Sequence, residues 1–423
     1  MLEVNFIREN KDFIVDSLSK RNMNSSLMIE SVIDLDVRKR KLQTELDKIL
    51  HQSNLISKEI GDLFKIGLQK EAIVLKEKTV KLKEASKELN EELISTKDEL
   101  QKLLYKIPNI PHKSVPKGKS EEDNVEVLSE GEIPKLPVNS LPHWELAKKY
   151  DIIDFELGNK ITGAGFPVYK GKGAKLQRAL ISFFLDMNTN AGYDEVQVPH
   201  LINEKSAFGT GQLPDKEGMM YYIKEDDLYL IPTAEVPVTN IYRDEIILES
   251  QLPKLLTSYT PCFRREAGSY GAHVRGLNRL HQFDKVEILR VEHPDNSYTA
   301  LDGMVEHVKS IIKKLNLPFR ILKLCGSDLG FTSCLTYDFE LFSAGQNKWL
   351  EVSSVSNFES FQANRLKLRF KDSSGKTKLA HTLNGSSLAL PRVLATLLEN
   401  NQTDKGIVIP KVLVPYTGFS VID

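Results

Sequence analysis

The chain has few cysteines and no long hydrophobic run. Only three cysteines occur in 423 residues, and Cys262, Cys325 and Cys334 are too scattered to form a CxxC pair. Neither a disulfide framework nor a thiolate zinc site is therefore expected, and no zinc is expected. The densest apolar stretch, 179–185, is too short to span a bilayer, and acidic residues stand where a signal peptide would be apolar. These absences predict a reduced, soluble, cytoplasmic protein.

Excess charge of either sign is also lacking. The chain carries 57 Lys and Arg against 58 Asp and Glu, a formal net charge of −1. That balance argues against a protein that coats nucleic acid through bulk positive charge. The charge is unevenly spread, because residues 37–106 contain sixteen basic and twelve acidic side chains. On charge alone, a solvated helical surface is the favoured interpretation of this excess.

Proline is absent from residues 31–104, and apolar residues recur there at coiled-coil spacing. The first seam is apolar at seven of nine positions: Leu35, Lys39, Leu42, Leu46, Ile49, Ser53, Ile56, Ile60 and Leu63. The second is apolar at eight of eleven: Leu68, Ala72, Leu75, Thr79, Leu82, Ser86, Leu89, Leu93, Thr96, Leu100 and Leu103. The pattern predicts two long helices, each roughly 50 Å in length.

The two helices are expected to form an antiparallel hairpin. Gly61 and Gly67, the only glycines of the segment, lie between the seams and favour a reversal there. The alternative, one continuous dimeric coiled coil, would need the heptad phase to run unbroken through these glycines. Residues 1–106 are thus predicted to be an N-terminal domain: a short helical cap over 1–30, with Phe6, Phe13, Ile14 and Leu18 as packing positions, and then the arm. Residues 107–120 hold three prolines and are expected to be a linker, and 121–423 a mixed domain that holds the active site.

Two segments of the mixed domain place charged side chains on strand-like backbone. In LYLIPTAEVPVTN, alternation puts Thr233 and Glu235 on one face, where they could hold an ammonium group or form an edge-strand surface pair. Residues 255–291 are predicted to form a strand, a glycine-bearing loop and a returning strand. Arg264 and Glu266 share a face of the outgoing strand, and the returning strand presents Phe283, Lys285 and Glu287. These side chains favour binding of a nucleotide and an amino acid over a structural ion-pair ladder. A guanidinium can bind phosphate, an aromatic ring can stack on a purine, and a carboxylate can bind an ammonium group.

Two further segments contribute polar side chains. Residues 348–365 place Glu351 among hydroxyl and amide side chains, which suits Mg²⁺ shared with phosphate oxygens or, alternatively, a hydrogen-bonded buried strand: Ser353, Ser354, Ser356 and Asn357. Residues 381–400 are predicted to be a strand through Asn384-Gly385-Ser386 that leads into an amphipathic helix. Arg392 lies near the start of that helix, where the helix dipole and the guanidinium both favour an anion; an arginine that merely caps or packs is the alternative.

Taken together, these segments resemble class II aminoacyl-tRNA synthetases, and in detail the bacterial seryl-tRNA synthetases. The resemblance covers essentially the whole chain. It is carried by GTGQLP at 209–214, LIPTAEVP at 230–237, CFRREAGSYG at 262–271, HQFDKVE at 281–287, YDFE at 337–340 and HTLNGS at 381–386. It implies an α+β fold, in which the antiparallel two-helix arm accompanies a catalytic domain built on an antiparallel sheet flanked by helices. Residues 173–199 resemble motif 1, a helix and a strand ending at Pro199 that form a homodimer interface.

The resemblance also implies roles for individual residues. The implied serine contacts are Thr233, Ala234, Glu235, Glu287, Asn384 and Ser386. The implied ATP contacts are Arg264, Arg265, Glu266, Leu280, Phe283, Glu351, Val352, Ser353, Ser354 and Arg392. Among them, Arg264, Glu351 and Arg392 would be catalytic, and Glu351 with Ser354 would hold Mg²⁺ that enters with ATP. The chain departs from the family pattern at Ala272, His273, Val274, Leu335, Val355, Asn364 and Pro391.

The implied reaction joins serine to tRNA(Ser) in two steps through a seryl-adenylate; whether tRNA(Sec) is a further substrate is left open by the sequence. The slight positive charge of the arm fits a contact with the tRNA backbone. Two rivals are a synthetase-like ligase that serves another carrier and a non-catalytic tRNA-binding or coiled-coil protein. The arm counts against the first, and the presence of Arg264, Glu351 and Arg392 counts against the second.

Overall fold

The computed structural model describes residues 1–215, 218–266 and 275–423. The chain divides into two compact units, each with its own buried core. The first comprises Met1–Ser19 and Met23–Pro108, and the second Lys20–Asn22 and Asn109–Asp423. The first unit is helical, and the second is built on a sheet with helices. The predicted α+β fold, with a helical arm and a mainly antiparallel sheet, is confirmed.

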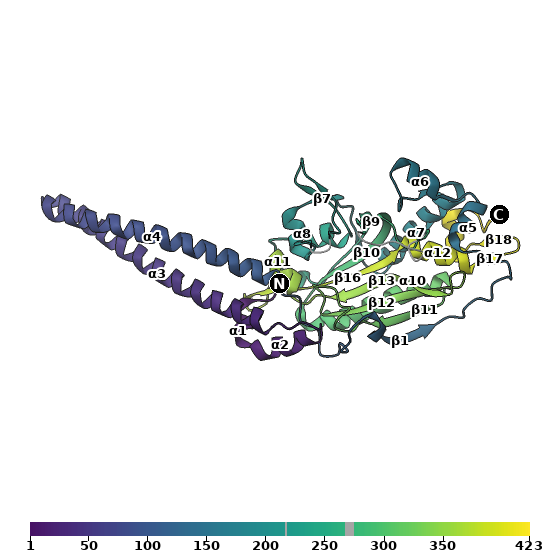
Figure 1. Cartoon of the computed structure of the whole chain (residues 1–423), viewed down its shortest axis with the longest axis horizontal. Coiled ribbons are helices and arrows are strands. Elements are labelled where there is room, and N and C mark those ends of the chain that lie inside the picture. Colours follow the sequence, from purple (N-terminus) through teal and green to yellow (C-terminus); the bar gives the residue numbers. More distant parts are fainter. Residues whose placement is uncertain (216–217, 267–274) are drawn as a thin grey trace. The chain divides into compact units, whose positions relative to one another are not determined.

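The first unit consists of four helices (Figure 1): α1 Val4–Glu9, α2 Lys11–Ser19, α3 Ser26–Lys65 and α4 Gln69–Leu104. The long helices α3 and α4 lie side by side and antiparallel, because Arg38 forms an ion pair with Glu92, 54 residues away, at 2.8 Å. The short helices cover the base of α3. Ile14 and Leu18 are fully buried there as expected, whereas the expected packing of Phe6 and Phe13 is wrong, since both are exposed.

The predicted seams form the interface of the hairpin. Leu42 and Leu46 of α3 pack with Leu93 of α4 in a buried cluster. The chain reverses between the two helices at Gly67, whose φ of +81° favours glycine. Gly61 is not part of the reversal but lies within α3. Because α3 pairs with α4 of the same chain, the alternative of one continuous helix is excluded.

The second unit is built on an eight-stranded sheet in the order β1-β11-β12-β13-β16-β10-β9-β4. The strands are β1 Val125–Glu130, β4 Asp194–Glu195, β9 Lys254–Phe263, β10 Gln282–Glu292, β11 Phe319–Lys323, β12 Leu335–Ser343, β13 Lys348–Asn357 and β16 His381–Ala389. All neighbours are antiparallel except β4, which runs parallel to β9. Of the region resembling motif 1, the helix is present as α7 Gly171–Asn190, but the strand β4 ends four residues before Pro199.

Helices cover one face of the sheet because the strands alternate in polarity. On β12, Phe339 and Leu341 belong to the buried core, whereas Asp338 and Glu340 point to the other face and line a cavity. The helices that pack on the apolar face are α7, α10 Ser297–Leu315 and α12 Leu390–Asn400, and α10 and α12 lie beside the strands in Figure 1. The alternation therefore leaves the second face free to carry polar side chains.

Smaller elements complete the second unit. Its other helices are α5 His143–Lys149, α6 Phe155–Ile161, α8 Glu204–Thr210, α9 Glu235–Asn240, α11 Phe361–Leu366 and α13 Val414–Thr417. Its short strands are β2 Ile153–Asp154, β3 Val168–Tyr169, β5 Leu201–Asn203, β6 Tyr222–Ile223, β7 Leu228–Leu230, β8 Ile246–Leu248, β14 Arg369–Lys371, β15 Thr377–Leu379, β17 Gln402–Thr403, β18 Gly406–Val408 and β19 Val421–Ile422. Within the described part of the chain, no helix combines the length and apolarity that crossing a membrane requires.

Candidate active site

A polar cavity of about 930 Å³ opens on the sheet face that the core helices leave free. Its floor is made by the outward side chains of β10, β12, β13 and β16. The lining includes residues from all four segments singled out in the sequence: Thr233, Glu235, Arg264, Lys285, Glu287, Glu351, Ser354, Ser356, Asn384 and Ser386. Side chains that are up to 153 positions apart in the sequence thus face one space.

Glu287 on β10 is the centre of a buried polar cluster. Its carboxylate accepts hydrogen bonds from the Thr233 hydroxyl at 2.6 Å and from the Asn384 amide at 3.1 Å. It also forms an ion pair with Lys285 at 2.7 Å, and the backbone N–H of Glu235 donates to it at 2.7 Å. A carboxylate has about four lone-pair sites, so these four contacts occupy its acceptor capacity and fix its position. The fixed carboxylate of Glu287, together with the neighbouring carboxyl group of Glu235, makes this part of the cavity a suitable environment for an ammonium group.

The two carboxyl groups of this cluster titrate differently. Burial alone would raise the pKa of Glu287, but Lys285 and the hydrogen bonds from Thr233 and Asn384 hold this pKa below its ordinary value. Burial and the neighbouring charge of Glu287 raise the pKa of Glu235 to about 7. The cluster consequently has one negative charge that persists well below neutral pH and a second that appears near pH 7.

Thr233 and Glu235 do not lie on a strand, contrary to the sequence expectation. Strand β7 ends at Leu230, and Glu235 is the first residue of α9. Ala234, the residue before the helix, is fully buried. The two side chains are nevertheless close, because the Glu235 N–H donates to the Thr233 hydroxyl at 3.3 Å. A helix of six residues is too short to show its period in the sequence, and that explains the error.

Gln362 on α11 is a site residue that sequence reasoning missed. Its amide donates a hydrogen bond to Glu235 Oε1 at 2.6 Å, and its carbonyl accepts one from the Thr382 hydroxyl at 2.8 Å. Gln362 is almost fully buried, so both contacts are shielded from water. Gln362 lies 127 residues from Glu235 in the sequence, so no local pattern indicated that the two side chains meet.

A second cavity, of about 170 Å³, adjoins the first and shares Arg264, Lys285, Glu351, Ser354 and Ser386 with it. Phe283 forms one wall, and the Arg264 guanidinium lies 5.4 Å from the centroid of its ring. The remaining lining includes most of the residues expected at ATP: Glu266, Leu280, Val352, Ser353 and Arg392. An aromatic face beside two guanidinium groups suits a purine joined to phosphates.

The backbone departs from a regular hairpin at the start of the connecting loop. Strand β9 ends at Phe263, so Arg264 and Glu266 lie just beyond it rather than on its face as expected. The ladder extends by one bond, from the Arg264 N–H to the carbonyl of His281 at 2.9 Å. Glu266 has a positive φ of 47°, which turns its side chain toward Arg279, with which it forms an ion pair. Arg265 is exposed and lines neither of the two cavities.

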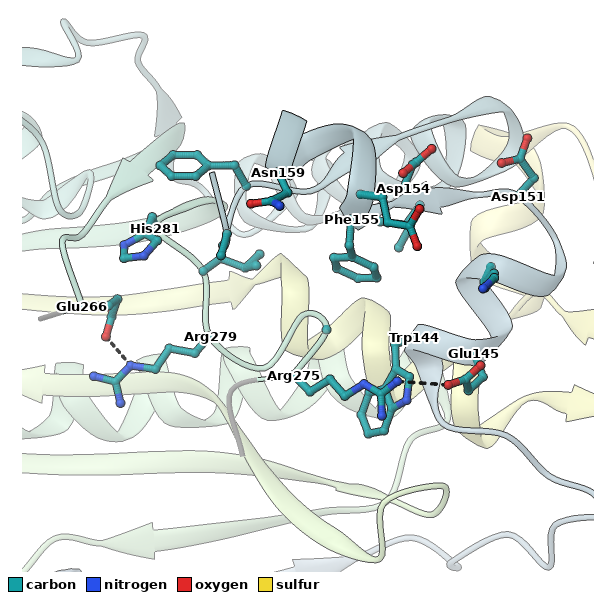
Figure 2. Close-up of a pocket in the computed structure, with 18 residues that line it drawn as sticks. Trp144, Glu145, Asp151, Asp154, Phe155, Asn159, Glu266, Arg275, Arg279 and His281 are labelled. Carbon is teal, nitrogen blue, oxygen red and sulfur yellow. Dashed lines mark hydrogen bonds and ion pairs between the residues drawn. The ribbon is translucent and has the colours of Figure 1, made fainter. Parts of the chain in front are cut away.

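A third cavity, of about 760 Å³, has the Glu266–Arg279 pair at one end (Figure 2). It shares Glu266, Arg279 and Leu280 with the cavity beside Phe283. Trp144 and Arg275 stack at its opposite end, with the guanidinium 4.9 Å from a ring centroid of the indole. The Glu266–Arg279 ion pair is therefore the partition between the two spaces.

A β-bulge on β13 gathers the oxygen atoms expected to hold Mg²⁺. The register with β12 shifts between the pairs Phe339–Ser353 and Glu340–Glu351, so one extra residue separates Glu351 from Ser354. Without the bulge, residues three apart would point to opposite faces; with it, both line the same cavity. Sequence alternation alone could not have placed Glu351 and Ser354 together.

Asp338 on β12 is a second residue that the sequence reasoning missed. It lines the cavity beside Glu351 and Ser354, and its Oδ1 has no hydrogen-bond partner among the described residues. Burial, together with the charge of Glu351, raises the pKa of Asp338 well above its ordinary value. An unpartnered carboxylate oxygen beside a second carboxylate and a hydroxyl is a donor set that fits a hard divalent cation.

Arg392 is held at the border of the cavity beside Phe283 by backbone oxygens. It is the third residue of α12, and Pro391 occupies the first turn, where proline is well tolerated. Its Nε donates to the carbonyl of Asn278 at 3.0 Å, and its Nη1 donates to the carbonyl of Glu351 at 2.9 Å. Leu335, a departure from the family pattern, is buried in the core and does not line these cavities.

Three departures in the connecting loop, Ala272, His273 and Val274, lie outside the described residues. Val355, another departure, is part of the buried core on β13. The predicted ATP and serine residues otherwise gather around the two adjoining cavities, with Arg265 and Ala234 as the exceptions noted above.

The fold and the site define a class II aminoacyl-tRNA synthetase. Residues 221–401 match the family described as the tRNA synthetase class II core domain (G, H, P, S and T), and residues 1–111 match the seryl-tRNA synthetase N-terminal domain. The chain belongs to the seryl-tRNA synthetase family and is an enzyme of the ligase class.

Relatives match along their whole length. A serine–tRNA ligase of Salinibacter ruber is 48% identical, over 100% of this chain and 99% of the relative. A serine–tRNA ligase of Hydrogenobaculum is 46% identical, over 98% of this chain and 99% of the relative. Among solved structures, the seryl-tRNA synthetase of Pyrococcus horikoshii complexed with ATP superposes with a TM-score of 0.92 at 32% identity, over 100% of this chain and 99% of that one.

Proposed function

We propose that this ligase activates L-serine with ATP to seryl-adenylate and then transfers the seryl group to the 3′-terminal adenosine of tRNA(Ser). The observation that carries the proposal is the junction of two cavities. One holds the Thr233–Glu235–Glu287 cluster, which suits an amino acid, and the other holds Phe283 and Arg392, which suit a nucleotide. Arg264 lines both cavities, where the two substrates would meet.

In the first step, a carboxylate oxygen of serine attacks the α-phosphorus of ATP, and pyrophosphate leaves. Thr233, Glu235 and Glu287 hold the ammonium group, and Asn384 and Ser386 bound the space around the side-chain hydroxyl. Arg264 stabilises charge on the α-phosphate, and Arg392 binds the γ-phosphate. No side-chain nucleophile is needed, because alignment and charge stabilisation supply the rate enhancement.

Mg²⁺ is the divalent ion proposed to accompany ATP. Glu351 and Ser354 would hold it, and the unpartnered oxygen of Asp338 lies beside them. When bound, the ion would neutralise charge on the phosphate oxygens. Within residues 1–215, 218–266 and 275–423, no cluster of three or more His, Cys, Asp or Glu side chains could hold a metal by itself. The phosphates of ATP would therefore complete the coordination.

In the second step, a hydroxyl of the terminal adenosine of tRNA attacks the activated carbonyl, and AMP leaves. The arm of α3 and α4 is the proposed tRNA contact, supported by its excess of basic side chains over residues 37–106. We further propose a homodimer formed through residues 173–199, action in the cytoplasm, and serine charging of tRNA(Sec) as well as tRNA(Ser).

Serine-dependent exchange between pyrophosphate and ATP tests the first step. The purified chain should catalyse exchange with L-serine and not with alanine, because alanine lacks the hydroxyl that the polar lining around the serine side chain, Asn384 and Ser386, would bind. Threonine must be excluded sterically and should also give no exchange. Absence of exchange with serine would refute the proposed activity.

Deletion of residues 31–104 tests the role of the arm. We expect serine-dependent exchange to survive, since the cavities lie wholly after residue 120. Charging of tRNA(Ser) should fall steeply, whereas unchanged charging would contradict a role for the arm in tRNA binding. A parallel assay with tRNA(Sec) decides whether that tRNA is a second substrate.

A further inference from the structure

His143 and Glu399 form a fully buried pair outside the residues proposed to touch substrate. His143 is the first residue of α5, and Glu399 lies near the end of α12. The imidazole Nδ1 is 2.6 Å from Glu399 Oε1, and the backbone N–H of His143 donates to the same oxygen at 2.8 Å. A buried carboxylate with this many partners is costly to assemble, so its location needs a reason.

The hydrogen bonds determine where the imidazole carries its proton. The backbone N–H of Leu277 donates to Nε2 at 2.8 Å, so Nε2 must be the unprotonated nitrogen. The proton therefore resides on Nδ1 and is donated to Glu399. Gly276 makes this contact possible, because a Cβ there would lie 2.2 Å from Nε2 and its φ is +70°. Both nitrogens are used, and each has a different task.

The segment that His143 holds is a wall of the nucleotide cavity. Leu277, Asn278, Arg279 and Leu280 all line the space beside Phe283. The carbonyl of Asn278 accepts the hydrogen bond from Arg392 Nε, so the position of this carbonyl fixes the guanidinium. The His143 contact is thus one residue away from the backbone group that orients Arg392.

Gln346, at the turn between β12 and β13, ties the same segment to Glu399 by a second route. Its amide donates to Glu399 Oε1 at 2.9 Å, and its carbonyl accepts a hydrogen bond from the Asn278 side chain at 2.8 Å. On the outer side, Arg275 stacks on Trp144 and pairs with Glu145 at 3.2 Å, as Figure 2 shows. Helix α5 therefore holds residues 275–277 through His143 on one side and through Trp144 and Glu145 on the other.

We propose that His143, supported by Glu399, is a positioning residue for ATP: it fixes the 277–280 segment and, through the Asn278 carbonyl, the guanidinium of Arg392. The inference rests on the ATP role proposed above for Arg392 and Phe283. A positioning role differs from a purely structural one in its effect on kinetics. Loss of the His143 side chain would raise KM for ATP and leave KM for serine unchanged.

Two substitutions of His143 separate positioning from packing. His143→Asn can place an amide where Nδ1 lies and keep the bond to Glu399, but it leaves the Leu277 N–H without an acceptor. His143→Gln can place its carbonyl oxygen where Nε2 lies and keep that bond. A buried donor left unpaired corresponds to about a tenfold effect. In serine-dependent exchange we expect KM for ATP to rise about tenfold in His143→Asn with KM for serine within about twofold, and His143→Gln to restore most of the loss.

Two further variants keep the test decisive if His143→Asn folds poorly. Gln346→Ala removes the second tie to Asn278 and should raise KM for ATP about threefold, again without a change for serine. His307→Asn is the control: His307 lies on α10, which packs on the apolar face of the sheet, and its Nε2 donates a hydrogen bond to Asn188 Oδ1 at 2.8 Å, so the substitution should lower the melting temperature alone. Equal rises of both KM values, or an unchanged KM for ATP in His143→Asn and Gln346→Ala, would overturn the inference. Loss of exchange in the unsubstituted enzyme would instead refute the proposed function.

Discussion

The serine end and the nucleotide end of the site are built in different ways. At the serine end, Thr233, Lys285 and Glu287 are buried and already bonded to one another. At the nucleotide end, the charged side chains are partly exposed and form ion pairs with one another. Arg279 pairs with Glu266, and Arg392 Nη1 lies 3.5 Å from a carboxylate oxygen of Glu351.

This difference indicates how each end meets its substrate. A buried, fully bonded cluster is expensive to disturb, so its side chains keep their positions whether or not an amino acid is bound. Exposed ion pairs contribute little to stability, commonly less than about 1 kcal/mol, and can exchange partners when a polyphosphate arrives. Substitutions at the serine end should therefore affect both folding and activity, and those at the nucleotide end mainly activity.

The largest expected effect is at Glu287. Glu287→Gln would leave Lys285 buried without its counter-ion and would remove the charge that attracts the serine ammonium. We expect kcat/KM for serine to fall about 10³-fold in the exchange assay, equivalent to roughly 4 kcal/mol, together with a clear drop in melting temperature.

A double variant is the control for this prediction. Adding Lys285→Met to Glu287→Gln removes the uncompensated charge, so the melting temperature should recover while serine use stays low. If Glu287→Gln reduces kcat/KM for serine by less than tenfold, the buried cluster does not bind the ammonium group.

Arg392→Ala probes the opposite end. The guanidinium is one-third exposed, and its partners are backbone carbonyls that water can reach once it is gone. We expect kcat/KM for ATP to fall about 10²-fold with little change in melting temperature. Arg392→Lys keeps the positive charge but loses the planar guanidinium with its paired N–H donors. Its kcat/KM for ATP should lie between the values of the parent enzyme and of Arg392→Ala. A matching rise in KM for serine would show that the two ends are not separable.

The same contrast governs what the sequence could predict. The arm follows from a local pattern, because the seam residues Leu42, Leu46 and Leu93 recur at heptad spacing and the reversal requires Gly67. On β12, alternation along the strand separates Asp338 from Phe339, so the polar face of that strand was open to prediction even though Asp338 was not singled out. These features depend on residues that are close together in the sequence, so a local sequence pattern is enough to predict them.

Long-range contacts explain what the sequence missed. The bulge on β13 depends on pairing with β12, and the helix that begins at Glu235 is too short to be recognised. Gln362 reaches Glu235 across 127 positions, and Glu399 reaches His143 across 256. Without the family resemblance, nothing in one sequence would bring these pairs together. The residues proposed to touch substrate were therefore easier to single out from the sequence than the residues that position them.

The titration of Glu235 sharpens the comparison further. Its pKa is raised to about 7, so the carboxyl group is protonated below that pH and cannot attract an ammonium group. We expect kcat/KM for serine to fall about tenfold for each pH unit below 7, and Glu235→Gln to abolish this dependence. A profile in the parent enzyme that stays flat between pH 5.5 and about 8 would contradict a role for Glu235 at the ammonium.

Stability should change with pH in the opposite direction. The folded-state pKa of Glu235 lies above its ordinary value of 4.5, so the folded state binds the proton more tightly than the unfolded chain does. The stabilising contribution is fully present below pH 4.5 and is lost as the pH rises through about 7. Melting curves of the parent and Glu235→Gln at several pH values should converge at low pH and diverge above 7.

Substitution of Gln362 should have the smallest effect on serine kinetics in this series. It bears on both the binding of serine and the pKa of Glu235. Its hydrogen bond to Glu235 favours the ionised carboxylate, so Gln362→Ala should move the midpoint of the serine pH profile above 7. Loss of one buried hydrogen bond predicts about a fivefold rise in KM for serine at neutral pH, with KM for ATP unchanged. Thr382→Val is the matched control, since it removes only the bond on the far side of Gln362 and should have about half the effect on a logarithmic scale. If Gln362→Ala raises KM without moving the midpoint, the glutamine acts by shape alone, and the raised pKa of Glu235 is set by burial and Glu287 without it.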